Sequence, residues 1–243
     1  LPVTNVMLPA LSRAQSDPVA YQAIALNFYR MIAVTLVPAG VGLFVVGRDI
    51  MQVLAPNWKE AGWLVTALAP AIMVQGFVNI TGSVLASAGK TKWLFLASLV
   101  LCLFLLQGYV TGYWLGESID GVENAPRGAL LGVAASYSLV MVLVVLVPYL
   151  SLTCSLVGIR FGDLVALSWY PAVVSLVMGG ATWLLSDVLL VNCSPWLRLV
   201  LVVPTGVVFF ALLAQRDVRW LVGQLVGQQS SDDQPEPDLS VSQ

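Results

Sequence analysis

Six long apolar segments, each without a charged residue at its centre, constrain this chain more than any other feature. They lie near residues 24–47, 62–88, 93–115, 129–151, 165–186 and 195–214. A helix of roughly 20 residues crosses the hydrocarbon core of a bilayer, so each segment is long enough to span a membrane. Hydrophobic residues make up 58% of the chain and charged residues 10%, which leaves too little polar surface to cover a soluble protein. The sequence therefore predicts a polytopic membrane protein.

The joints between these segments are short, and none is long enough to hold a folded domain outside the bilayer. We therefore expect an all-α transmembrane helix bundle, with a lobe of six full spans over residues 11–214. Residues 1–10 are apolar but too short to span, and we interpret them as the end of a preceding transmembrane helix. Residues 215–243 form a tail. Its first part, with Trp220 and other apolar residues beside two arginines, predicts a short helix on the membrane surface, and its acidic, proline-bearing end predicts disorder.

Basic residues set the predicted orientation. An even number of spans puts both ends of the lobe on one side, and the larger group of basic residues lies on that side: Arg13, Arg30, Lys90, Lys92, Arg160, Arg216 and Arg219. The opposite side receives Arg48, Lys59, Arg127 and Arg198. Because cytoplasmic loops carry an excess of lysine and arginine, we expect Arg13 and the C-terminus to be cytoplasmic.

Catalytic chemistry finds little support in the sequence. The chain has no histidine, the commonest general base and metal ligand, and no joint brings two carboxylates into an obvious pair. The three cysteines show no paired spacing, so neither a metal site nor a disulfide framework is predicted. The Gly89-Lys90-Thr91 sequence is not a P-loop, because Val84 stands where the first glycine is required. We therefore expect no enzyme activity, catalytic residue, metal or cofactor, and the net charge of −2 does not favour a nucleic-acid partner.

Polar but uncharged residues inside the second apolar segment are the first candidate for a functional site. Gln75, Asn79, Ser83 and Ser87 recur every four residues and therefore share one slowly drifting helix face. Amides in hydrocarbon need partners, so this face should meet other helices or a watery cavity. Two interpretations stay open: a stripe that lines a path for a polar substrate, or hydrogen bonding between helices beside the small residues Gly76 and Gly82.

Asn27 and Arg30, near the start of the first apolar segment, are the second candidate. Arg30 could bind an anionic headgroup or phosphate, or it could extend to the lipid interface without any substrate contact. In the third segment, Gly108, Gly112 and Gly116 repeat every four residues, a spacing typical of close helix packing in membranes. Gly128 and Gly132 in the next segment fit the same interpretation.

The opening stretch resembles a known transporter family. "MLPALSRAQSD", in which Pro9, Leu11, Ser12 and Arg13 form a Pro-x-Leu-Ser-Arg segment, is followed by an apolar segment with a central proline and glycine pair. "SVLASAGKTKW" then closes the next helix with a small-residue, glycine and basic turn. In this order the motifs, which cover about residues 1–93, resemble the oligosaccharide flippases of the multidrug/oligosaccharidyl-lipid/polysaccharide (MOP) exporter superfamily. The sequence departs from the family near Trp58, where Ala55-Pro56-Asn57 replaces a usual glycine.

The resemblance implies that the chain is the C-terminal lobe of a two-lobed transporter of about 14 helices, with the N-terminal lobe of the same chain missing. It implies movement of undecaprenyl-linked oligosaccharide, a repeat unit of lipopolysaccharide, O-antigen or exopolysaccharide, across the bacterial inner membrane by alternating access. The partners would be lipid-linked oligosaccharide and membrane lipids. We hypothesise a substrate path along Asn27, Arg30, Gln75, Asn79 and Ser83, although no motif of the family marks these residues.

Several alternatives stay open. Within the superfamily, the chain could be a peptidoglycan-precursor flippase or a drug antiporter, although an antiporter would be expected to carry a carboxylate inside the membrane. Outside it, a membrane-embedded polysaccharide polymerase or ligase and a purely structural membrane subunit are the other classes. A polymerase or ligase would be expected to have a large external loop, and here the longest joint is residues 48–61.

Overall fold

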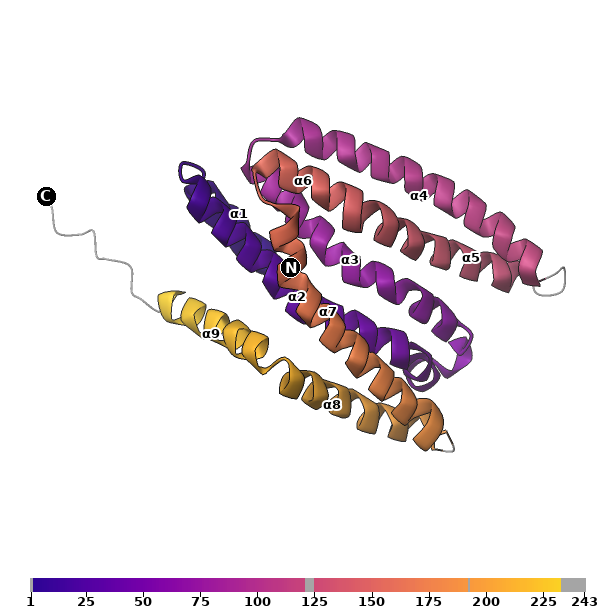
Figure 1. Ribbon diagram of the computed structural model, residues 1–243. Coiled ribbons are helices and arrows are strands. Elements are labelled where there is room, and N and C mark those ends of the chain that lie inside the picture. The colour runs from indigo at the N-terminus through magenta and orange to yellow at the C-terminus, as the bar shows by residue number, and fades with distance from the viewer. Residues whose placement is uncertain (1, 121–124, 192, 233–243) are drawn as a thin grey trace, which may run out of the picture.

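The computed structural model describes residues 2–120, 125–191 and 193–232, and every element within these ranges is helical. Six helical stretches are long and apolar enough to cross a membrane: Pro18–Leu54, Ala61–Ser87, Thr91–Ser118, Arg127–Val157, Phe161–Leu189 and Pro195–Leu213. They correspond one to one to the six predicted segments. The all-α, multi-pass membrane bundle that the sequence predicted is thereby confirmed (Figure 1).

The elements follow one another along the chain with short connections. They are α1 (Pro2–Arg13), α2 (Pro18–Leu54), the 3₁₀ turn η1 (Pro56–Trp58), α3 (Ala61–Ser87), α4 (Thr91–Asp120), α5 (Ala125–Val140), the π-helical segment η2 (Met141–Tyr149), α6 (Leu150–Val157), α7 (Phe161–Leu184), the π-helical segment η3 (Leu185–Leu189), α8 (Pro195–Leu213) and α9 (Gln215–Asp232). The fourth span combines α5, η2 and α6. Pro148 lies in η2, where its missing N–H accompanies the change in helix geometry.

Two boundaries in the terminal parts differ from expectation. Helix α1 continues through Pro9 to Arg13, beyond the expected end near residue 10. Helix α9 is the helix expected at the start of the tail, and it runs on to Asp232. The expected disorder at the end of the tail concerns residues 233–243, which lie outside the described residues.

Helix α2 is much longer than the segment expected from hydropathy. It has 37 residues, about 55 Å at 1.5 Å per residue, whereas the hydrocarbon core is about 30 Å thick. Asp17 caps its start by accepting hydrogen bonds from the backbone N–H groups of Val19 and Ala20, and Pro18 occupies the first turn, as is favourable at a helix N-terminus. The helix therefore extends beyond the expected span of 24–47 at both ends.

The connections divide between two ends of the bundle. We call the end with residues 14–17, 88–90 and 158–160 the Arg13 end, and the end with residues 55–60, 190–191 and 193–194 the Trp58 end. Helix α2 lies centrally and packs against α3, α7 and α8. Helix α3 also packs against α5, and α5 carries α4 at the outer edge (Figure 1).

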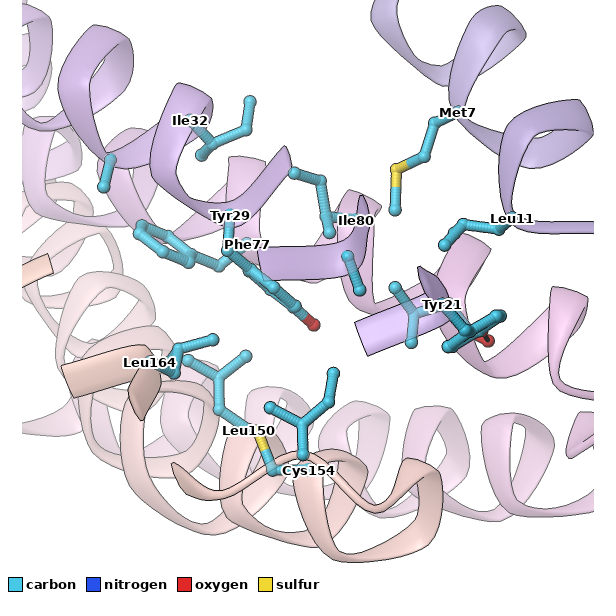
Figure 2. Packing of buried hydrophobic residues seen from close by; sticks show 14 of the residues in the cluster. Met7, Leu11, Tyr21, Tyr29, Ile32, Phe77, Ile80, Leu150, Cys154 and Leu164 are labelled. Atoms are coloured by element: carbon cyan, nitrogen blue, oxygen red, sulfur yellow. Dashed lines mark hydrogen bonds between the residues drawn. The ribbon is translucent and has the colours of Figure 1, made fainter. Parts of the chain in front are cut away.

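The largest buried cluster lies where α1, α2, α3, α6 and α7 meet near the Arg13 end (Figure 2). Tyr29 of α2 is fully buried there and stacks against Phe77 of α3 with ring centroids 6.3 Å apart. Its hydroxyl lies 2.9 Å from Thr81 Oγ1, while Thr81 itself donates to the Phe77 carbonyl at 2.7 Å. Since the one hydroxyl proton of Thr81 is engaged, Tyr29 is the donor to Thr81. The Tyr29 hydroxyl therefore has a hydrogen-bond partner although it lies inside an apolar core.

Helices α4 and α5 approach through glycines, as the sequence predicted from their spacing. A Cβ atom added to Gly132 would lie 2.0 Å from the Gly112 carbonyl oxygen, and one added to Gly116 would lie 2.0 Å from the Gly128 carbonyl oxygen. Both clashes are with backbone, which cannot rotate away. Only glycine therefore allows this contact, and α4 has little other support because most of its surface is exposed.

We predict that Gly132→Val separates α4 from α5. The added side chain must push the two backbones apart, an overpacking that costs about 1–3 kcal/mol, so the melting temperature of the purified protein should fall by several degrees. Gly42→Ala is the matched control, because a Cβ atom at Gly42 meets nothing within 4 Å. An unchanged melting temperature for Gly132→Val would contradict the observed packing.

Candidate functional site

The predicted polar stripe on α3 divides into two parts with different surroundings. Asn79 and Ser83 line a groove of about 370 Å³ together with Ser98 of α4 and Tyr149 of η2. Gln75, one turn away, is exposed beside Tyr137 of α5, whose hydroxyl lies 3.5 Å from Gln75 Oε1. Ser87, in contrast, is buried and lies 2.7 Å from the Tyr21 hydroxyl.

The two amides of the stripe are exposed close to the middle of a membrane span. Gln75 lies next to the midpoint of α3, which runs from Ala61 to Ser87, and Asn79 follows one turn later. The contact of Gln75 with Tyr137 is too long to be a good hydrogen bond. Within the described part of the chain, the Asn79 side chain has no hydrogen-bond partner, although Asn79's carbonyl oxygen accepts from Ser83 at 3.3 Å. Lipid cannot supply the missing partners, so this face requires another protein surface or water.

Arg30 lies in a second place, near the Arg13 end of α2. Its guanidinium forms an ion pair with Asp217 of α9, and the side chain of Asp217 is only 8% exposed. The indole of Trp220, also in α9, lies 4.4 Å from the guanidinium carbon, which is a cation–π contact. Arg30 is thus already neutralised by the C-terminal helix. With Arg216, Trp169 and Tyr170 it lines a cavity of about 500 Å³.

The structure does not bring the two predicted site regions together. The groove at Asn79 and the cavity at Arg30 share no lining residue. Asn27 is exposed on α2, one turn before Arg30. A single substrate path through all five predicted residues would therefore need a further surface that connects the two places.

A third polar place, at the Trp58 end, was not anticipated from the sequence. Arg198 of α8 lies 3.6 Å from Asp49 of α2 and donates to the carbonyl oxygens of Leu190 at 2.9 Å and Val191 at 2.6 Å. Arg48 lies over the ring of Trp63, 4.1 Å from its centroid. These side chains line a cavity of about 780 Å³ between α2, α7 and the beginnings of α3 and α8, which we call the Trp58-end cavity.

One sequence signal could have pointed to this cavity. The Arg48-Asp49 pair lies within a helix that stays apolar on both sides, "LFVVGRDIMQVL", and charges at such positions are costly unless they are paired or functional. On hydropathy alone, the Arg48-Asp49 pair marks the end of the predicted span of 24–47. In the structure it belongs to α2, and Asp49 is buried.

Comparison with known proteins gives one match. A family model described as "Polysaccharide biosynthesis protein" matches residues 1–63. The matched residues make up α1, α2 and the start of α3, and they include Asn27, Arg30, Arg48 and Asp49, whereas Gln75 and Asn79 lie beyond them. No curated protein and no solved structure matches the chain. The match connects the first quarter of a six-span membrane bundle with polysaccharide biosynthesis.

We predict that cysteines placed at Gln75 and Asn79 are accessible from water. In a protein freed of Cys102, Cys154 and Cys193, both should react with a membrane-impermeant thiol reagent, because exposed amides at this depth need water or a polar partner.

A cysteine at Leu85 is the control for this labelling experiment. Leu85 lies on the same helix but is only 1% exposed, so it should stay unlabelled. Protection of the two stripe positions to the level of Leu85 would show that the face is packed against protein or lipid and lines no aqueous path.

We further predict that Asp217→Asn loosens α9. The substitution leaves a partly buried guanidinium without its charged partner, and losing a hydrogen bond to a charged group costs about 1.5–3 kcal/mol. Trypsin should then cleave at Arg216 and Arg219 several-fold faster. Glu60→Gln is the control, since it breaks the exposed ion pair of Glu60 with Arg127, and exposed pairs contribute little. Equal cleavage rates in both variants would refute the anchoring role of Asp217.

Proposed function

We propose that this chain is part of a flippase that moves undecaprenyl-linked oligosaccharide across the bacterial inner membrane. The cargo would be a repeat unit of lipopolysaccharide, O-antigen or exopolysaccharide. Transport would proceed by alternating access, with the Arg13 end and the C-terminus in the cytoplasm. In this proposal the chain acts as a MOP-type transporter lobe and performs no chemical step of its own.

The observation that carries the proposal is the pair of exposed amides at mid-depth on α3. A saccharide crossing a bilayer needs hydrogen-bond donors and acceptors along its way, because hydrocarbon offers none. Gln75 and Asn79 supply both kinds of group without a fixed charge. They lie on a bundle whose first 63 residues match a family described as polysaccharide biosynthesis protein, which makes a sugar the polar cargo that fits best.

A lipid-linked cargo also explains how the remaining surfaces are used. Large apolar side chains are exposed over most of α4 and α8, which suits contact with lipid, so a polyprenyl tail could stay in the bilayer while the sugars follow the amides. The path needs a second wall facing α3. In the proposal a second lobe provides this wall, and the exposed amides are the part of the path that the described chain contributes.

The proposal predicts the outcome of deletion and complementation in the host of this gene. Deletion should abolish surface polysaccharide and leave lipid-linked repeat units in the inner membrane, and the complete gene should restore both. Gln75→Leu combined with Asn79→Leu should reduce restoration about fivefold or more at equal protein level, because the loss of two hydrogen-bonding groups removes about 1–3 kcal/mol of stabilisation from the crossing sugar. Ile72→Ala, an exposed apolar position on the same helix, should restore fully.

Three other outcomes of this experiment would contradict the proposal in whole or in part. Restoration by the double leucine variant would keep transport and remove the amides from the path. Surface polysaccharide that persists after deletion would refute the flippase assignment. Loss of surface polysaccharide with repeat units already accumulated on the outer leaflet would place the defect after translocation and favour a polymerase or ligase.

A further inference from the structure

We propose that the Trp58-end cavity is a binding site for a short, uncharged oligosaccharide. This inference rests on the proposed function, in which the Trp58 end faces away from the cytoplasm. The site would hold the sugar part of the cargo as it emerges. It is separate from the amide stripe, since its lining shares no residue with the groove at Asn79.

The dimensions of the cavity fit such a ligand. Its volume of about 780 Å³ lies within the range of about 300–1,000 Å³ that is usual for small-molecule sites. Two adjacent glycines of α7, Gly179 and Gly180, form part of the wall. A Cβ atom added at Gly180 would meet nothing within 4 Å, so this part of the wall opens into free space.

The lining offers both kinds of contact that a sugar ring makes. A pyranose has an apolar face of C–H groups and a rim of hydroxyls that donate and accept hydrogen bonds. Trp183 is half exposed and lines the cavity, so its indole is available to cover the apolar face of a ring. Asp49 and Asp187 can accept hydrogen bonds from hydroxyls, and Arg48 and Arg198 can donate to them.

The charges of the cavity favour a neutral ligand over a phosphate or a lipid headgroup. Two arginines and two aspartates line it, so their formal charges cancel, and an anion would meet the carboxylates as well as the guanidinium groups. The neighbouring cavity between α2, α7 and α8, of about 530 Å³, has no charged side chain in its lining. Of these two neighbouring cavities, the one at the Trp58 end therefore holds the charged groups that could bind an emerging sugar.

Several of these groups are fixed before any ligand arrives. Arg198 is held by two backbone carbonyl oxygens and by Asp49, and the side chain of Asp49 is only 8% exposed. Arg48 is held over Trp63. Groups that are already ordered lose little conformational entropy on binding, so a weakly binding sugar can still be recognised.

The test fills the cavity without disturbing its walls. Gly180→Phe should project its ring into the free space at this position, whereas Gly162→Phe is a matched control on the same helix. Gly162 is exposed near the start of α7 and also has nothing within 4 Å of an added Cβ atom. Both variants are made in the full-length protein, purified and placed in lipid nanodiscs. The probe is the repeat-unit oligosaccharide released by mild acid from the host's own surface polysaccharide.

Calorimetric titration should show equal Kd values for wild type and Gly162→Phe, and a Kd at least about tenfold higher for Gly180→Phe. Trp183→Ala, at an unchanged melting temperature, should weaken binding to a similar degree, which guards against misfolding of the phenylalanine variant. Absence of binding to wild type, or equal binding by wild type, Gly180→Phe and Trp183→Ala, would overturn the site.

Failure of the site and failure of the proposed function can be told apart. Suppose that deletion of the gene abolishes surface polysaccharide, but that Gly180→Phe restores it and binds the probe normally. The flippase assignment then stands, and the Trp58-end cavity is not the saccharide site. If deletion leaves surface polysaccharide intact while the probe binds wild type and Gly180→Phe binds it weakly, the site is a real saccharide site and the flippase assignment is wrong.

Discussion

Two charge clusters on α2 are separated by about the thickness of a bilayer core. Arg30 pairs with Asp217 near the Arg13 end, and Asp49 pairs with Arg198 near the Trp58 end. At 1.5 Å per residue, the positions of Arg30 and Asp49 are about 28 Å apart along the helix, close to the about 30 Å of a hydrocarbon core. Both pairs can therefore lie at the membrane edges, where charges cost least. They also hold α9 at one end and the start of α8 at the other.

The spans and the α4–α5 contact could be predicted from the sequence because both depend on local patterns. Apolar runs mark the spans, and glycines every four residues mark a close helix contact. The pairings of Arg30 and Asp49 could not be predicted, because their partners lie on helices far along the chain. A hydropathy window treats an unpaired charge as the end of a span. The expected span of 24–47 accordingly stops just before Arg48, whereas α2 continues to Leu54.

The polar stripe on α3 does not stay on one side of the helix. Four residues advance an α-helix by slightly more than one turn, so the stripe from Gln75 to Ser87 drifts by about 120° around α3. Gln75 and Asn79 consequently face outward, while Ser87 turns into the core and meets Tyr21. Ser83, between them, is half-buried and lines the groove together with Asn79. Ser87 has a structural role because α1 and α2 pack against the end of α3 and bury it there.

In the proposed flippase, uncharged amides at mid-depth and charges at the edges would suit the movement of a large polar cargo. A charged side chain exposed at mid-depth would need a permanent partner or counterion, whereas an amide costs less and can exchange its hydrogen bonds with each passing sugar. Contacts that are individually weak also release the cargo readily. In the same proposal, the fixed groups at Asp49 and Arg198 would hold an emerging sugar briefly at the far edge and so oppose its return.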